Sequence, residues 1–225
     1  MPRFFALLVS ALLFITGISI VLVQILRFLG LSRMSRGRRE RERRRILGLL
    51  GRQNVDMAPW KIGEIELLSY KIHYSNKRSL FSRWLQGYAQ TIFNEPLLPF
   101  AARVYGPDQY ILCFTTHDRH YSLVSLGDIT EAFVMNKKIG VIRENVLERD
   151  GKVIGEIRSA SSSYHSIIVN DRDLGHIKPH VTRNDLRITD RRMEMVMDQS
   201  FAQEDKDVFT LILGYKIFDP IASQS

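Results

Sequence analysis

Arginines dominate one short stretch of this chain, RMSRGRRERERRR at residues 33–45, which holds eight arginines, two glutamates and no lysine. Close to a bilayer, each arginine adds on the order of 1 kcal/mol of attraction to anionic lipid. The same stretch also serves as a topology signal, and a solvated helix in which Glu40 faces Arg43 and Arg44 fits it as well. The predicted lipid-contact residues are Arg33, Arg36, Arg38, Arg39, Arg41, Arg43, Arg44 and Arg45.

A second basic cluster begins at the segment KPHVTR, residues 178–183. It is the densest basic area of the chain beyond the arginine run, and it is the candidate there for contact with headgroup phosphate. The simpler interpretation is that these residues form the solvated face of strands, because they alternate with apolar ones. The candidate headgroup residues are Lys178, His180, Arg183, Arg187, Arg191 and Arg192.

The histidines invite a metal-binding interpretation at HDRH (residues 117–120) and at HIKPH (residues 176–180). Neither spacing matches a known metal site, and Pro179 disfavours a helix that would bring the two histidines of HIKPH to one face. Asp and His are also common in hairpin turns such as the one expected at HDRH. We therefore predict no metal site and no cofactor.

The usual signatures of catalysis are missing from the sequence. It contains no phosphate-binding Gly-Lys-Ser/Thr loop, no Gly-x-Ser-x-Gly elbow and no pair of cysteines. Asp205 and Asp207 stand where acids favour the start of a helix, which explains them better than acid-base chemistry does. Cys113 lies in the apolar segment YILCF and is interpreted as a buried, inert thiol. These observations favour a non-enzymatic protein.

The element that must position the arginine run is the apolar stretch before it. Residues 4–26 are 23 residues without a charge. As a helix they span roughly 35 Å, enough to cross a hydrocarbon core of about 30 Å. We predict a transmembrane helix within residues 1–30. A cleavable signal is the alternative, but its apolar core is shorter and is followed by a small-residue cleavage site.

The charges on the two sides of this segment predict its orientation. Arg3 stands alone before it, whereas nine arginines follow within 19 residues of Leu26. Positive residues beside a first helix stay on the cytoplasmic side, so the N-terminus is expected outside and the C-terminal domain in the cytoplasm. A mitochondrial inner-membrane protein with its domain in the matrix would show the same pattern and stays an alternative.

The positive charge of the chain is confined to its N-terminal part. The net charge is +8, yet residues 1–52 hold eleven arginines against two glutamates, which leaves a net charge of −1 for residues 53–225. The folded part therefore exerts no overall attraction on polyanions, and we expect no nucleic-acid partner.

Residues 31–59 are interpreted as a juxtamembrane segment and linker, and residues 60–225 as one β domain. Around ten short alternating stretches, rich in β-branched residues and separated by Gly, Asp, Asn or Pro, begin at residue 62. Such spacing is typical of a sandwich or a closed barrel. Asp150-Gly151 predicts a two-residue type I′ turn between two of these strands.

Two stretches break the strand pattern. In residues 79–93 the apolar side chains fall on one helical face, flanked by basic residues, which predicts an amphipathic helix. Arg83, Trp84 and Tyr88 are its candidates for contact with the membrane interface. The favoured interpretation, however, is that this helix covers an open end of the sheet, since most amphipathic stripes face a core.

The second exception is the stretch EDKDVFTLILGYKIFDP, residues 204–220. Its apolar side chains point in every direction around a helix axis, so the helix must be buried. At about 13 apolar residues it is too short to span a bilayer. We expect it inside the β structure, with Gly214 permitting a close approach to a strand and Asp219-Pro220 ending the helix.

A sheet with a hydrophobic C-terminal helix threaded through it resembles the tubby C-terminal-like group, which includes phospholipid scramblases and LURP-one-related proteins. The resemblance covers about residues 60–221. It implies a mainly β fold, a closed antiparallel barrel of about twelve strands around the buried helix. It is carried by RDGKVIGEI (149–157), VNDRDLGHI (169–177), LRITDRRMEMVMD (186–198) and the terminal helix 206–218 with Asp219.

For function, the resemblance implies phosphoinositide binding, as associated with tubby-like members, or calcium-linked lipid movement, as associated with scramblases. The segment DRDLG lacks the acids of a calcium loop, and the membrane segment precedes the domain here instead of following it. We expect a membrane-anchored, non-enzymatic module that binds anionic phospholipid or an integral membrane protein. The alternatives are an accessory subunit of a membrane complex and a lipid-handling or scramblase-like enzyme.

Overall fold

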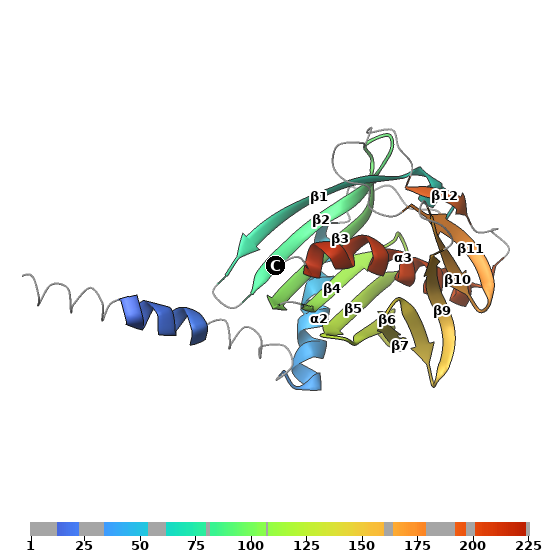
Figure 1. Cartoon of the computed structure of the whole chain (residues 1–225). Helices are drawn as coiled ribbons and strands as arrows, with labels where there is room; N and C mark the ends of the chain where they lie inside the picture. Colours follow the sequence, from blue (N-terminus) through green and yellow to red (C-terminus); the bar gives the residue numbers. More distant parts are fainter. Residues whose placement is uncertain are drawn as a thin grey trace, which may run out of the picture.

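The computed structural model describes residues 13–22, 34–53, 62–79, 82–106, 108–159, 164–178, 192–196 and 201–223. Most of this part is a twelve-stranded sheet whose strands follow one another in chain order (Figure 1). The strands are β1 (Leu68–Arg78), β2 (Arg83–Thr91), β3 (Pro96–Gly106), β4 (Gln109–Thr115), β5 (His120–Leu126), β6 (Thr130–Val134), β7 (Lys137–Arg143), β8 (Val146–Arg149), β9 (Lys152–Ser159), β10 (His165–Val169), β11 (Arg172–Ile177) and β12 (Met193–Val196). The sheet is accompanied by α2 (Arg36–Gln53), η2 (Ile62–Leu67) and α3 (Gln203–Ser223).

Neighbouring strands pair antiparallel, and several are joined by two-residue turns in which both residues have positive φ. Asp150 and Gly151 have φ angles of 52° and 76° and join β8 to β9. Met135 and Asn136 join β6 to β7 in the same way, with φ angles of 48° and 67°. This backbone matches the twist of the flanking strands, so the predicted hairpin at Asp150-Gly151 is confirmed.

The sheet is not closed into a barrel. Strands β1 and β12 are its two ends, and no strand pairing joins them among the described residues. One backbone hydrogen bond of 2.8 Å, from the Arg192 N–H to the Leu68 carbonyl, spans the gap. The predicted closure is therefore wrong, whereas the mainly β class is confirmed. Residues 62–67, expected as part of the first strand, form η2 instead, so β1 begins only at Leu68.

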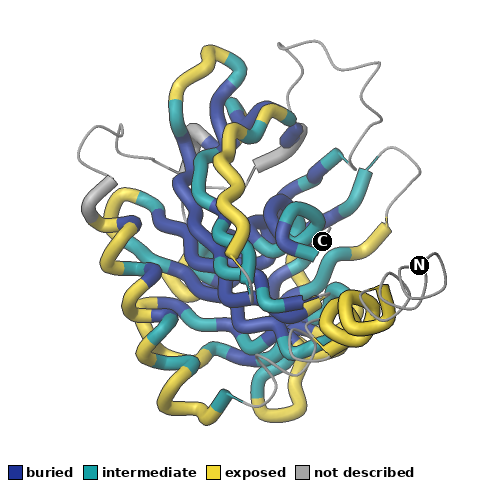
Figure 2. The backbone as a smooth tube through the Cα atoms, turned by 90° about the vertical axis from the view of Figure 1, so that its left-hand side faces the viewer, coloured by how far each residue is buried: buried dark blue, intermediate teal, exposed yellow. Residues whose placement is uncertain are grey.

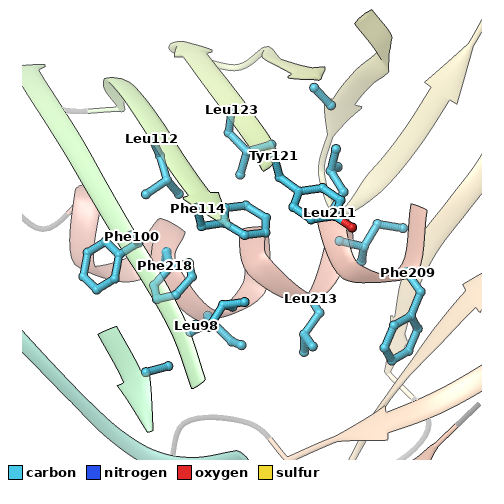
Figure 3. Packing of buried hydrophobic residues seen from close by; sticks show 14 of the residues in the cluster. Leu98, Phe100, Leu112, Phe114, Tyr121, Leu123, Phe209, Leu211, Leu213 and Phe218 are labelled. Carbon is cyan, nitrogen blue, oxygen red and sulfur yellow. The ribbon is translucent and has the colours of Figure 1, made fainter. Parts of the chain in front are cut away.

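Helix α3 fills the concave side of the curved sheet (Figure 1). Phe209, Leu213 and Phe218 are all at most 1% exposed. Figure 3 shows the α3 side chains among those of β3, β4 and β5, and the Phe218 ring stacks on Phe100 with 4.4 Å between the ring centroids. The predicted buried C-terminal helix is confirmed, because strands surround its apolar sides.

Two details of α3 concern its close packing and its end. A Cβ atom at Gly214 would lie 2.2 Å from Cζ of Phe114. The predicted close approach to a strand is therefore confirmed, and the contacting group is the Phe114 side chain of β4. The predicted end at Asp219-Pro220 is wrong, since α3 continues to Ser223. The Arg83 guanidinium donates to the carbonyls of Ile221 and Ala222, which satisfies this last turn.

Helix α2 covers the opposite face of the sheet and completes a second core. Ile46 and Leu50 pack with Ile111 and Cys113 of β4, and all four are fully buried. Because α3 covers one face of β4 and α2 the other, every residue of β4 is buried. Residues 48–53, which the sequence placed in the linker, are therefore the last turns of a packed helix.

Residues 83–91 form strand β2 instead of part of an amphipathic helix. Leu85 and Ala89 share one face of a strand as well as one face of a helix, so their spacing does not distinguish the two. At Gly87 a Cβ atom would lie 1.9 Å from the His73 carbonyl oxygen across the β1–β2 ladder. The helix prediction is wrong because pairing with both neighbours outweighs the local periodicity.

The N-terminal part of the chain is described only in residues 13–22, which are helical and exposed (Figure 2). Among the described residues no helix combines the length and the apolar character needed to cross a membrane. Most of the predicted transmembrane segment lies outside the described residues, so it stays a prediction.

Candidate functional site

Helix α2 carries most of the arginine run, and its sequence explains how it binds the sheet. Arg43, Ile46 and Leu50 recur at intervals of three and four residues, and all three are buried. The carbonyl of Ser35 accepts the first helical hydrogen bonds, from the N–H groups of Arg38 (2.9 Å) and Arg39. One face of α2 is thus fixed on β3 and β4, while the other faces solvent.

Arg43 is the exception within the arginine run, because it is only 1% exposed. Its guanidinium lies 4.2 Å from the centre of the Phe133 ring and donates from Nη2 to the Glu40 carboxylate at 2.7 Å. Nη2 also lies 3.5 Å from the Asn136 carbonyl oxygen, at the limit of a hydrogen bond. Nη1 is buried and has no hydrogen-bond partner. The prediction that Arg43 belongs to an exposed lipid-contact surface is wrong, because its side chain is buried.

Glu40 holds two of these arginines together. Its carboxylate accepts from Arg43 and also from Nε of Arg44 at 3.0 Å, at the spacings expected from the sequence. Partial burial alone would raise the pKa of Glu40, but the hydrogen bonds from Arg43 and Arg44 outweigh it and lower the pKa. Glu40 therefore carries a charge at neutral pH and neutralises part of the arginine run.

The other arginines of α2 divide by exposure. Arg39 is half-buried and donates from Nη1 to the Met34 carbonyl at 2.9 Å, and Arg33 lies outside the described residues. The side chains of Arg44 and Arg45 are 70% and 69% exposed, respectively. The arginines exposed on the solvent side of the helix are Arg36, Arg38, Arg41, Arg44 and Arg45.

A pocket of about 470 Å³ lies between the N-terminal half of α2 and the β6–β7 hairpin. Five basic side chains and two carboxylates contribute to its walls. Both carboxylates are paired, Glu40 with the arginines beside it and Glu131 with Lys138 at 2.6 Å. The pocket is therefore electropositive. Its charged lining residues are Arg36, Arg39, Glu40, Arg43, Arg44, Glu131 and Lys138.

The hairpin side of this pocket was missed at the sequence level. Phe133, Asn136 and Lys138 are some ninety residues further along the chain than α2, and no local pattern connects the two segments. The only available signal was the strand-turn-strand pattern around Asn136, which predicts a hairpin but not its neighbour. The strand order brings the hairpin to α2: the helix packs on β3 and β4, and β6 is only two strands from β4 in the same sheet.

The second basic cluster does not join this site in the described residues. Arg192 is 4% exposed, and desolvation lowers its pKa to about 10. Its guanidinium lies over the Tyr70 ring at 5.8 Å, so its predicted headgroup contact is wrong: the residue is buried where β1 and β12 approach. Lys178 lies over the Tyr164 ring at 5.7 Å. His180, Arg183, Arg187 and Arg191 lie outside the described residues.

The residues of the expected interfacial helix are also placed elsewhere. Arg83 binds the end of α3, and burial followed by repulsion from Arg78 lowers its pKa. Nε1 of Trp84 donates to the Gln86 side chain at 3.1 Å. The Tyr88 ring lies 5.2 Å from the His73 ring across the β1–β2 ladder. Arg83 and Tyr88 serve the packing of β2 against α3 and β1, whereas Trp84 lies beside α2 and lines a shallow pocket of about 260 Å³ together with Arg45.

Comparison with protein-family models, with curated proteins and with solved structures finds no match to this chain. The resemblance to the tubby C-terminal-like group therefore stays a prediction.

Proposed function

We propose that this chain is a membrane-anchored, non-enzymatic module whose helix α2 binds anionic phospholipid at the cytoplasmic face of a bilayer. The observation that carries the proposal is the solvent side of α2. Five exposed arginines lie there on a helix whose opposite side is fixed to the sheet. A rigid row of cations is a better lipid contact than a flexible tail, because little conformational freedom is lost on binding.

The place of α2 in the chain supports the same proposal. Arg36 follows the last residue of the apolar segment, Leu26, by only ten residues. If that segment spans the bilayer, the start of α2 lies within a short tether of the headgroups, where the surface potential is strongest. Residues 53–225 have a net charge of −1, so the arginines of α2 are the main source of attraction in the folded part.

The test is vesicle binding by the fragment from Arg33 to Ser225, which keeps the contacts between α2 and the sheet. Replacing Arg38, Arg41 and Arg45 by Gln removes about 1 kcal/mol each, so affinity for vesicles containing phosphatidylserine should fall roughly a hundredfold. Binding by the unchanged fragment should also weaken as salt rises. The matched control replaces Arg143, Lys152 and Arg158 on β7 and β9 and should bind as the unchanged fragment does. Equal losses in both triple variants would contradict the proposal.

A second candidate function is binding of a protein partner at the free edge of β1. Residues 73–78 of β1 are exposed on both faces, and among the described strands β1 pairs only with β2. Such an edge offers unpaired backbone groups to an additional strand. An accessory subunit of a membrane complex would use this edge. In the vesicle assay this function predicts no difference between neutral and anionic lipid.

We also propose that the domain is related to the tubby C-terminal-like group. Two features support it: twelve strands in chain order, and a hydrophobic C-terminal helix on the concave side of the sheet. The open edge between β1 and β12 departs from the closed barrel that the resemblance implies.

A further inference from the structure

The pocket between α2 and the β6–β7 hairpin has a feature that lipid binding by the exposed arginines of α2 does not explain. Arg43 is a buried residue of its lining, and its Nη1 has no hydrogen-bond partner. Leaving a buried donor without an acceptor costs about 1–3 kcal/mol, and more when the group is charged. An acceptor bound in the pocket would remove this cost.

The surroundings of Arg43 hold its guanidinium in one orientation. Phe133 lies under its plane, and Glu40 accepts from Nη2 and Nε along one edge. The guanidinium is therefore held in place before any ligand arrives, so little of its conformational freedom is lost when an anion binds.

The charges of the pocket indicate the class of ligand. The pocket is lined by five basic groups and two carboxylates. Both carboxylates are already paired, Glu40 with Arg43 and Arg44 and Glu131 with Lys138. Neither Arg36 nor Arg39 has a carboxylate partner among the described residues. A phosphate monoester carries about −1.5 to −2 charges at pH 7 and offers three acceptor oxygens, whereas a diester carries one charge. The excess of positive charge suits the monoester.

The size of the pocket adds a second criterion. At about 470 Å³ it falls within the range of sites for small molecules and is larger than a phosphate group requires. We propose that this pocket binds a phosphate monoester carried on a polar group, with Arg36, Arg39 and Nη1 of Arg43 donating to the phosphate oxygens. The phosphate itself comes from a lipid headgroup or from a soluble compound. Only the lipid source rests on the proposed function.

The first experiment uses the full chain in uncharged detergent micelles, with inorganic phosphate as the probe and dimethyl phosphate as the monoanionic comparison. Calorimetric titration at constant ionic strength should give at least tenfold tighter binding of inorganic phosphate. Arg39→Gln and Lys138→Gln should each weaken it at least fivefold. The matched controls Arg158→Gln and Lys152→Gln, both on β9, should change it less than twofold.

Arg43→Lys keeps the charge but removes the fork, so it should weaken phosphate binding at least tenfold while circular dichroism verifies the fold. If that variant is unfolded, the Arg39 and Lys138 variants decide alone. Equal affinities for the two probes, or equal losses in test and control variants, would overturn the site.

The second experiment adds lipid to the same micelles. If the phosphate is lipid-borne, short-chain phosphatidic acid should displace inorganic phosphate and short-chain phosphatidylglycerol should not. If neither lipid competes, the site stands as one for a soluble phosphate compound. Failure of phosphatidylserine vesicle binding with phosphate binding intact would refute the proposed function and leave the pocket standing. The reverse result would refute the pocket alone.

Discussion

Arg43 and Arg44 are neighbours in the sequence, yet their side chains lie in different surroundings. Arg44 is 70% exposed, whereas Arg43 is buried between Phe133 and Glu40. The difference follows from the helical period, because Arg43 belongs to the face that carries Ile46 and Leu50. Composition treats the eight arginines as equivalent, but the structure makes one of them part of the domain and leaves five for a partner.

The pair of Glu40 and Arg43 predicts a specific loss of stability. Glu40→Ala should lower the free energy of unfolding by about 3 kcal/mol, at the low end for breaking a buried pair, because the Glu40 side chain is 33% exposed. Denaturant titration would measure this. Glu148→Ala, which breaks the exposed pair with Arg143, should cost under about 0.5 kcal/mol. A loss no larger than that control would refute the role of Glu40.

The same carboxylate gives a pH dependence. The pKa of Glu40 is lowered in the folded protein, so its contribution is complete above the pKa of an unfolded carboxyl group. The contribution disappears as the pH falls through the folded pKa. The stability difference between the unchanged chain and Glu40→Ala should therefore shrink on acidification from pH 7 to below that pKa, as denaturant titrations at several pH values would show.

The pKa of Asp219 shifts in the opposite direction to that of Glu40. Burial raises its pKa, although the Tyr110 hydroxyl donates to its carboxylate. A raised carboxyl pKa stabilises the fold below the unfolded pKa, and that stabilisation is lost as pH rises through the folded one. Asp219→Asn keeps an acceptor for Tyr110 without the charge, so at pH 8 it should be at least as stable as the unchanged chain. Thermal unfolding checks this, and a clear loss of stability would contradict it. Tyr110→Phe removes the hydrogen bond to Asp219 and should lower the free energy of unfolding by about 1 kcal/mol.

At the scale of elements, Gly87 distinguishes the strand from the helix that periodicity predicted. Gly87→Ala places a Cβ atom against the His73 carbonyl in β1, so it should lower the free energy of unfolding by at least about 2 kcal/mol. Gly48→Ala, at an exposed position of α2 with open space around it, should raise it by about 0.5–1 kcal/mol. Chemical denaturation measures both changes. A gain at Gly87 would mean that the segment is helical.

Patterns within single elements made much of the fold predictable. The all-round apolar character of residues 208–218 predicted a buried helix, and Asp150-Gly151 predicted a hairpin, because both depend on nearby residues. The segment 79–93 could not be decided in this way, since Leu85 and Ala89 fit either periodicity. The pocket was out of reach because five strands, β1 to β5, separate Arg43 from Phe133 in the sequence, and only the folded sheet brings the two residues together.

At the scale of the whole molecule, the sheet is covered by a helix on each face, and only one of these helices is basic. Helix α3 fills the concave face and contributes to the main core, whereas α2 lies on the opposite face with its arginines toward solvent. Exposed residues gather at the turns and along the outer strands (Figure 2). In the part of the chain that the structure describes, this arrangement places five exposed arginines on the solvent side of α2, close in the chain to the segment that enters the bilayer in our account.

The most direct test of that account locates α2 relative to the bilayer in the full chain. Gly37 is exposed with open space around it, and Cys113 is buried, so a spin label on Gly37→Cys reports from α2 alone. In bilayers containing phosphatidylserine, a lipid-bound relaxation agent should increase the relaxation rate of this label far more than that of a label on Lys152→Cys. In neutral bilayers the difference should diminish. Equal relaxation of both labels in anionic and neutral bilayers would contradict the account.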